Sequence, residues 1–483
     1  MSLSKSPSFV KAFCLVLLLA SICISNGSFA QLATSSPYTR YGIGRINEKG
    51  YGNSLGMGGT YVALQNDSLP LFFVNAGNPA SYSSNRLTSV GLGLNINRTE
   101  LQDANNTNTV LSGSVGYLAM VFPINPWWGT SVGLQPFSSV GYNVLDTTTI
   151  SNVGSVELMY EGDGGINKAY FGNAIQPLYG IYKRFLNSEK YDSLIQAGEV
   201  DKANQMLKRR RALQPLSLGF NVSYLVGAIN HVQRSEFPSS NTAFNTRTGT
   251  TTRVSDIYFD YGVQYAYAFD TVAGENENVQ LFTGATFATQ TALGSSIDSL
   301  TYTYFNNVFD AEVIKDTITN VAGTKGEIVI PMSFGFGLGF KKGQKWLIAS
   351  DFTMEDWSSF KSFNISQNFF NSMRVALGSQ FVPDMKASGK YAYFKRINYR
   401  FGLKYFQTML ELKNSRITEQ AFTFGLGLPV GRNFLLRNYS MLNVGAEVGM
   451  RGSTDNGLVK ENYVNVNISF SINELWFVKP KFD

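Results

Sequence analysis

The last well-patterned stretch of the chain decides the fold: Val464-Asn465-Val466-Asn467-Ile468-Ser469-Phe470-Ser471-Ile472-Asn473. Even positions hold only Val, Ile or Phe, and odd positions hold only Asn or Ser. This period of two predicts a β-strand, and its length suits a strand that crosses a bilayer at a tilt. A face of Asn and Ser opposite an apolar face indicates water on one side of the strand and lipid on the other.

The same alternation recurs along the chain, for example from Ser89 to Ile96. The pattern predicts an all-β fold, a 14-stranded antiparallel transmembrane β-barrel, and an even strand number suits a bacterial barrel. The fourteen predicted strands are 87–98, 111–122, 129–145, 155–175, 215–228, 253–269, 279–295, 326–341, 345–358, 371–382, 395–408, 417–430, 437–451 and 461–473.

Composition agrees with a two-faced wall. Charged residues make up 15% and aromatic residues 14% of the 483 residues, whereas soluble domains carry about 25% charged residues. The formal net charge of +6 includes Lys5 and Lys11 of the N-terminal segment. The remaining charge is small and dispersed, which argues against a nucleic-acid partner.

The N-terminus has the pattern of a signal peptide, residues 1–30. Lys5 and Lys11 precede an apolar run from Ala12 to Ile24 that is too short for a comfortable membrane span, and Ser28-Phe29-Ala30 predicts cleavage after Ala30. Both cysteines of the chain lie within this segment, so we expect no disulfide in the mature chain. An exported chain of amphipathic strands is expected in the outer membrane, in contact with its lipid.

If both ends of the chain face the periplasm, long outer loops should alternate with short inner turns. Long polar stretches at 99–110, 229–252 and 296–325 fit the outer side. Residues 183–213 break the rule, because they keep helical spacing on the periplasmic side, with Gly198 as a stop between two short helices. This helical insertion is either a tolerated surface feature or a docking element for a periplasmic partner, with Arg209, Arg210 and Arg211 exposed to acidic groups.

Residues 31–86 precede the first predicted strand and show the pattern of neither a barrel strand nor a long loop. They are followed by the barrel (87–473) and by a C-terminal tail (474–483). They include Ser36–Gly44, the Gly-rich Leu55–Thr60 and Phe73–Ser81, which contains Asn78-Pro79-Ala80. This segment resembles the N-terminal hatch of the long-chain fatty acid transporter (FadL) superfamily, which plugs a 14-stranded barrel. Together with Gly133–Tyr142 and Leu475–Lys479, it is similar to a Bacteroidetes branch of outer-membrane proteins, and more distantly to PorV-like barrels.

A hatch is also reasonable on physical grounds. A barrel of fourteen strands is too wide for side chains to fill, so its lumen is either open or plugged. Asn78 before Pro79 favours an extended turn, and its amide can bond polar groups of the lumen. Gly58 and Gly59 allow close packing against the wall. The alternative, a disordered periplasmic arm, fits the apolar run Leu69–Val74 poorly.

The third predicted strand contains a proline, Pro136, between Gly133 and Gly141. Proline cannot donate to a β-ladder and is confined to edges or bulges. In the resembling family a kink in the third strand opens a lateral gap through which apolar ligand leaves into lipid. Pro136 with its flanking glycines either forms such a gap or marks a strand end near the rim.

Catalytic constellations are missing from the sequence. His231 is the one histidine, predicted to lie solvated in an outer loop, and no metal-ligand spacing, phosphate-binding loop or cofactor motif accompanies it. We therefore expect no enzyme, no metal and no cofactor.

Two functions remain, both implied mainly by the resemblance. One is uptake of hydrophobic, fatty-acid-like small molecules across the outer membrane. The other is a non-transporting barrel subunit of a secretion or assembly complex, with periplasmic or outer-membrane protein partners. A general diffusion porin ranks last, because the inward faces are expected to carry Asn, Ser, Gly and Tyr instead of charges.

Overall fold

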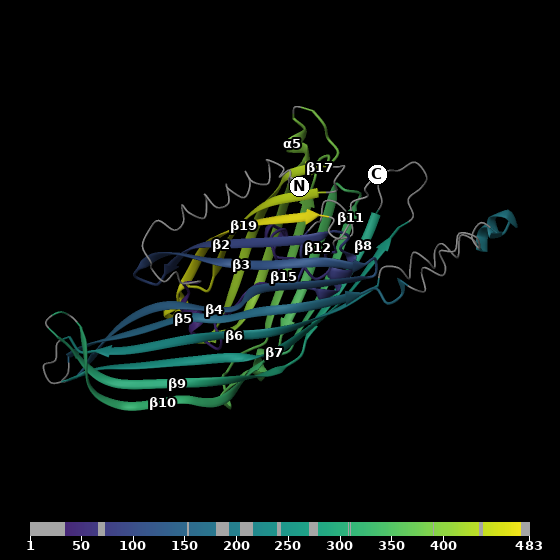
Figure 1. Cartoon of the computed structure of the whole chain (residues 1–483). Coiled ribbons are helices and arrows are strands. Elements are labelled where there is room, and N and C mark those ends of the chain that lie inside the picture. Colours follow the sequence, from purple (N-terminus) through teal and green to yellow (C-terminus); the bar gives the residue numbers. More distant parts are fainter. Residues whose placement is uncertain are drawn as a thin grey trace, which may run out of the picture.

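The computed structural model describes residues 34–65, 73–151, 154–179, 193–202, 216–238, 243–269, 279–307, 309, 311–389, 391–433 and 438–474. Its strands form one antiparallel sheet that closes on itself, because the last strand, β19, pairs with the first wall strand, β2. The result is a 14-stranded barrel (Figure 1).

Twelve crossings of the wall are single strands, and two are built from consecutive strand segments, β8 with β9 and β10 with β11. The wall strands are β2 (Thr88–Gln102), β3 (Thr107–Asn125), β4 (Trp128–Ile150), β5 (Gly154–Ile175), β6 (Ser217–Glu236), β7 (Asn245–Ala268), β8 (Val279–Ala288), β9 (Thr291–Asn306), β10 (Glu312–Ile330), β11 (Ser333–Lys342), β12 (Trp346–Glu355), β15 (Ser372–Phe381), β16 (Asn398–Leu412), β17 (Ser415–Asn433), β18 (Asn438–Arg451) and β19 (Lys460–Glu474).

Every one of the fourteen predicted strands coincides with a wall crossing. The prediction of long outer loops is wrong. Residues 229–236 and 245–252 continue β6 and β7, and 296–306 and 312–325 continue β9 and β10. The reason is that these polar stretches are rich in Thr, a β-branched residue that suits a strand outside the membrane as well as within it. Figure 1 shows β4 to β7, β9 and β10 extending beyond the rest of the wall.

Strand β11 illustrates how the wall separates lipid from lumen. Phe334, Phe336, Leu338 and Phe340 are exposed on the outer face, whereas the intervening positions are buried. The intervening residues include glycines because the N-terminal segment lies directly behind them: a Cβ added at Gly337 would lie 2.8 Å from the backbone nitrogen of Ala63. Glycines on the inner face of the wall therefore leave room for the backbone of the N-terminal segment.

Residues 34–65 and 73–87 lie inside the barrel and carry η1 (Pro37–Arg40), β1 (Arg45–Ile46), η2 (Leu55–Met57) and η3 (Pro79–Ser84). We call this segment the hatch. Its first part joins a large buried apolar cluster with side chains of many wall strands, including Tyr38 and Ile43 of the hatch with Phe137, Trp357 and Leu410. The hatch therefore has its own packed interface with the barrel wall.

Three small elements lie outside this scheme: β13 (Lys361–Ser362), β14 (Ile365–Ser366) and α5 (Ala392–Arg396), with η4 (Trp357–Ser359) and η5 (Asp455–Gly457) in turns. No helix among the described residues is long and apolar enough to cross a membrane. Of the predicted helical insertion, 193–202 is described; it contains short helical stretches on either side of Gly198, which has a φ of +76°. The predicted signal peptide, its cleavage point and the C-terminal tail lie outside the described residues apart from Glu474.

Candidate functional site

Asn78 is the central anchor of the hatch and is completely buried. Its side-chain Nδ2 donates to the carbonyl oxygen of Val62 at 2.7 Å, and lies 3.3 Å and 3.4 Å from those of Val263 and Ala285 on β7 and β8. Its Oδ1 accepts from the amide of Ala80 at 3.1 Å, which caps η3. One amide thus fixes the Asn78-Pro79-Ala80 turn and joins it to the wall.

The wall makes room for this turn with glycine. A Cβ added at Gly262 of β7 would lie 2.0 Å from Asn78 Oδ1, and one at Gly219 of β6 would lie 2.5 Å from the backbone nitrogen of Ala80. Neither distance is compatible with a side chain. The predicted hatch motif and two glycines in separate wall strands therefore form one fitted contact.

Gly58 and Gly59 make a second contact on the opposite wall. Both have positive φ, +68° and +72°, a conformation that favours glycine. A Cβ at Gly58 would lie 2.7 Å from the carbonyl oxygen of Leu403. Arg374 of β15 donates to the carbonyl oxygens of both glycines at 2.7 Å and 3.0 Å.

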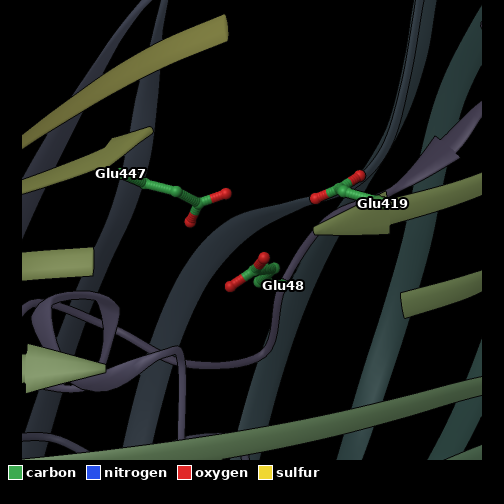
Figure 2. Close-up of side chains that lie close together, drawn as sticks. All are labelled: Glu48, Glu419 and Glu447. Atoms are coloured by element: carbon green, nitrogen blue, oxygen red, sulfur yellow. The ribbon is translucent and has the colours of Figure 1, made fainter. Parts of the chain in front are cut away.

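A buried ionic cluster holds the middle of the hatch. Lys404 of β16 donates to Glu48 of the hatch at 2.5 Å and to Glu447 of β18 at 2.6 Å, and lies 3.0 Å from Glu419 of β17. Figure 2 shows the three carboxylates coming from separate parts of the chain and lying close together. The Lys404 and Glu419 side chains are each only 1% exposed, so the charges are shielded from water and interact strongly.

The cluster continues toward the outer end, defined as the end opposite to the start of β2 and the end of β19. Arg451 of β18 bridges Glu419, at 2.8 Å from its Nε, and Glu461, at 3.0 Å. The hatch meets this arm twice, because Arg45 pairs with Glu419 at 3.4 Å and the Ser36 hydroxyl donates to Glu461. Three hatch residues, Glu48, Arg45 and Ser36, therefore bind side chains of strands β16 to β19.

Three carboxylates this close together resemble a metal site, since Glu48, Glu419 and Glu447 each offer an oxygen within 4.8 Å of the others. However, the Lys404 ammonium lies among these oxygens at hydrogen-bonding distance. It supplies the positive charge that a metal ion would bring. The arrangement fits a structural ionic cluster.

Burial raises the pKa of Glu48, but Lys404 and then Arg374 outweigh that effect, so its pKa lies below the ordinary 4.5. Glu48 is therefore ionised at neutral pH. Its attachment to Lys404 should persist until the solution is distinctly acidic.

The seam between β3 and β4 is the second feature of the site. Their pairing runs from Asn125 with Trp128 to Leu118 with Leu134 and stops there. Beyond it, the 107–117 part of β3 pairs with β2 and the 135–150 part of β4 with β5, but no pairing joins them to each other.

Pro136 lies two residues beyond Leu134, the last β4 residue that pairs with β3, and the β4–β5 register shifts between Pro136 and Ser138. The hatch pairs with the edge of β4 that is left free: Arg45 faces Ser139 and Ile46 faces Ser138. The amide of Ser36 donates to the carbonyl of Gly141 at 2.8 Å, where a Cβ would lie 2.0 Å from Thr34. Gly133 instead accommodates Tyr170, whose ring a Cβ would approach to 2.6 Å.

Four cavities surround the hatch and share lining residues. An outer vestibule of about 530 Å³ includes Arg40 and Leu410. Leu410 also lines a mostly apolar cavity of about 70 Å³, which shares Arg45 and Ile46 with a cavity of about 80 Å³ at the ionic cluster. That cavity shares Arg45 and Glu48 with a fourth, of about 100 Å³, which reaches Pro136 at the seam. The cavities lie in series from the outer end to the seam, and the hatch segment 45–48 lines three of them.

His231 and the three arginines 209–211 are the remaining positions that the sequence singled out. His231 does not lie in a solvated loop: it is half-buried on β6, with Nδ1 2.8 Å from the Tyr142 hydroxyl. Sequence alternation missed this because the strand continues beyond the expected membrane crossing. Arg209, Arg210 and Arg211 lie outside the described residues.

The expectation of inward faces without charges is wrong. The lumen contains a second buried pair, Lys168 with Asp260 at 2.6 Å, besides the Lys404 cluster. Each charge was visible in the sequence at a polar-face position of a predicted strand. What alternation alone could not show is that residues far apart in the chain meet as pairs. The Lys404 cluster binds the hatch, so the lumen differs from the water-filled channel of a diffusion porin.

A family model described as BamG matches residues 9–182 and 198–483. No curated protein matches the chain. Among solved structures, the CymD monoaromatic hydrocarbon channel matches with a TM-score of 0.50 at 14% identity, covering 89% of this chain and 99% of that one. The Pseudomonas putida toluene transporter TodX matches with a TM-score of 0.51 at 14% identity, covering 90% and 100%. At this identity the likeness concerns the fold.

Proposed function

The chain belongs to the BamG family and has a FadL-like outer-membrane barrel, and from these premises we propose that it passes hydrophobic small molecules across the outer membrane. Cargo enters the vestibule, moves along the apolar outer part of the lumen and leaves sideways between β3 and β4. The hatch controls this route. Passage of this kind needs no catalysis, and we propose none.

The observation that carries the proposal is the unpaired seam, because it coincides with the cavity next to the hatch. An unpaired strand edge facing lipid leaves backbone groups without partners in an apolar medium. Here hatch backbone pairs with part of the β4 edge, at residues 137–141. If the hatch segment moved, the same edge would border a lateral opening.

The outer lumen supports an apolar cargo. Its largest buried apolar cluster contains Tyr38, Phe137, Phe360, Phe369 and Leu410, which lie around the outer part of the hatch. Such a lining suits apolar compounds, whereas a water-filled porin suits polar ones. Two solved structures with a similar fold are named as a hydrocarbon channel and a toluene transporter. These names also indicate apolar small molecules as cargo.

Uptake of radiolabelled toluene and oleate by cells that carry or lack the protein tests this proposal. Ser114 lines the seam cavity, and the indole of Ser114→Trp is large enough to occupy a space of about 100 Å³. Thr109→Trp, at an exposed position of the same strand, is the matched control. We expect Ser114→Trp alone to reduce uptake to the level of cells without the protein. Equal uptake with and without the protein would overturn the proposal.

A second candidate, a subunit of a protein secretion or assembly complex, is favoured by the outer part of β10. Residues 312–325 are exposed on nearly every side and pair, among the described residues, only with β9. An open strand edge can pair with an added strand of another protein. Affinity purification from the native outer membrane, with mass spectrometry of proteins and lipids, separates the two functions: a stoichiometric protein partner supports the second.

A further inference from the structure

The seam cavity differs in chemistry from the apolar lumen above it. It lies between the hatch and strands β2, β3, β4 and β19, and has a volume of about 100 Å³. Amides and hydroxyls supply much of its lining, from Asn97, Ser112, Gln135, Asn465 and Asn467. A purely apolar cargo would therefore leave the lumen past a polar wall.

The oxygens of this wall are buried and have no hydrogen-bond partner among the described residues. They are Gln135 Oε1, Asn467 Oδ1, Asn97 Oδ1, Asn465 Oδ1, the Ser112 hydroxyl and the Tyr51 hydroxyl. The Asn467 amide nitrogen, by contrast, already donates to Asn95 Oδ1 at 2.6 Å. The amide oxygens can only accept, and the Ser112 and Tyr51 hydroxyls can also donate, so the wall calls for a ligand that donates hydrogen bonds and can accept them as well.

Three simple ligands would bind this wall less well than an uncharged polar head group. A hydrocarbon would leave each of these buried oxygens without a hydrogen bond, which is unfavourable. A carboxylate can only accept, so it would leave the four amide oxygens unpaired. A cation would meet Arg45, and Glu48, the one carboxylate of the lining, is already paired with Lys404 at 2.5 Å. An uncharged head group with several hydroxyl or amide donors has none of these disadvantages.

The lipid-facing sides of β3 and β4, the two strands of the seam, are apolar. Leu111, Val115 and Leu118 on β3 and Leu134 on β4 are all exposed, at 47–71%, on the side that faces lipid. A molecule held by its head in the cavity could extend an apolar tail through the unpaired seam along these side chains. The cavity of about 100 Å³ has room for several ordered water molecules, and therefore for a head group with more than one hydroxyl.

We propose that the cavity at the β3–β4 seam is a binding site for an uncharged amphiphile whose hydroxyl-bearing head group is held by Gln135, Ser112 and Asn467. This inference rests on the proposed lateral route and names the ligand that binds most tightly at its seam, an amphiphile with a neutral polar head; toluene and oleate pass the same seam with weaker binding. The amide oxygens recognise the head, and the bilayer receives the tail.

Binding to the purified full chain in lipid nanodiscs tests the site without any transport. Three probes share a ten-carbon chain: monodecanoylglycerol, decanoate and decane. We expect monodecanoylglycerol to bind most tightly, with one molecule per chain. Gln135→Met keeps the length of the side chain but removes the acceptor, and should weaken that binding about 3- to 10-fold.

Ser112→Ala is a smaller change on a neighbouring strand, and should weaken the same binding by a similar factor even if Gln135→Met folds poorly. Gln233→Met, at an exposed position of β6, is the matched control and should bind as the unchanged protein does. Equal or tighter binding of decane or decanoate, or unchanged binding by both cavity variants, would overturn the site. Binding with no uptake would overturn only the transport function, whereas uptake of toluene and oleate without monodecanoylglycerol binding would overturn only this site.

Discussion

Lys404→Met is the substitution that tests most sharply how the hatch is held. Methionine matches the length of the lysine chain but carries no charge, so the change removes the ammonium from among Glu48, Glu419 and Glu447. Glu419 keeps Arg451 and Arg45, and Glu48 keeps Arg374 at 3.8 Å. Glu447 keeps only the Tyr463 hydroxyl, at 2.7 Å, among the contacts that the described residues make to it.

The contacts that remain determine how much of the free energy of unfolding is lost. Removing one partner of a buried ion pair destabilises by about 3–5 kcal/mol, because the other charge stays buried and uncompensated. Two of the three carboxylates here keep a cation, so we expect the lower end, about 3 kcal/mol at neutral pH. Replacing the orphaned carboxylate as well, in Lys404→Met/Glu447→Gln, should recover roughly half of the loss.

Urea titration in phospholipid vesicles, followed by tryptophan fluorescence, measures the effect, and limited proteolysis of the hatch shows which part is released. Lys202→Met is the matched control, because Lys202 forms an exposed pair with Glu199 and exposed pairs contribute little. A Lys404→Met protein with an unchanged unfolding midpoint, or a double variant less stable than the single one, would refute the reasoning.

The remaining predictions concern the same contact between hatch and wall. The pKa of Glu48 lies below 4.5, so the ionised Glu48 stabilises the folded protein fully above about pH 4.5, and this stabilisation is lost as the pH falls through the lowered pKa. Proteolysis of the hatch should therefore increase in that acidic range in the unchanged protein. The Glu48→Gln variant should lack this part of the pH dependence. Gly262→Ala should displace Asn78, because its Cβ would lie 2.0 Å from Asn78 Oδ1, whereas a Cβ at Gly249 meets nothing within 4 Å. We expect Gly262→Ala to destabilise by about 1–3 kcal/mol in the same urea titration, and Gly249→Ala, the control, to stay close to the unchanged protein; equal midpoints would contradict the fitted contact.

The barrel was largely predictable because each membrane strand must show its two environments in its own sequence. The alternation from Val464 to Asn473 reappears in the β19 pairing with β2 and β18. Strand ends were less predictable. The polar, Thr-rich 245–252 part of β7 faces water whether it forms a loop or a strand, so its polarity does not distinguish the two.

The contacts that hold the hatch could not be read from local pattern. Glu48 and Lys404 are separated by 356 positions, and a charge at a lumen-facing position gives no indication of its partner. The same applies to Gly262, which reads as an ordinary strand glycine until Asn78 is placed against it. A small residue or a charge in the middle of a predicted membrane strand is the signal that points to a filled lumen.

The central claim is that cargo leaves through the β3–β4 seam only when the hatch segment moves, and a reversible tether tests it most directly. Ile46 and Ser138 are antiparallel partners between hatch and wall, and such neighbours have Cα atoms about 4.5–5.5 Å apart, within the range of a disulfide. Because both cysteines of the chain precede residue 31, Ile46→Cys/Ser138→Cys introduces the only cysteine pair within residues 31–483.

The control is Gln102→Cys/Thr107→Cys, which joins β2 and β3 where they already pair. The measurement is uptake of toluene and oleate by each double variant, oxidised and then reduced. The account predicts that oxidation stops uptake in Ile46→Cys/Ser138→Cys, that reduction restores it, and that the control is unaffected. Undiminished uptake by the oxidised hatch tether would contradict it.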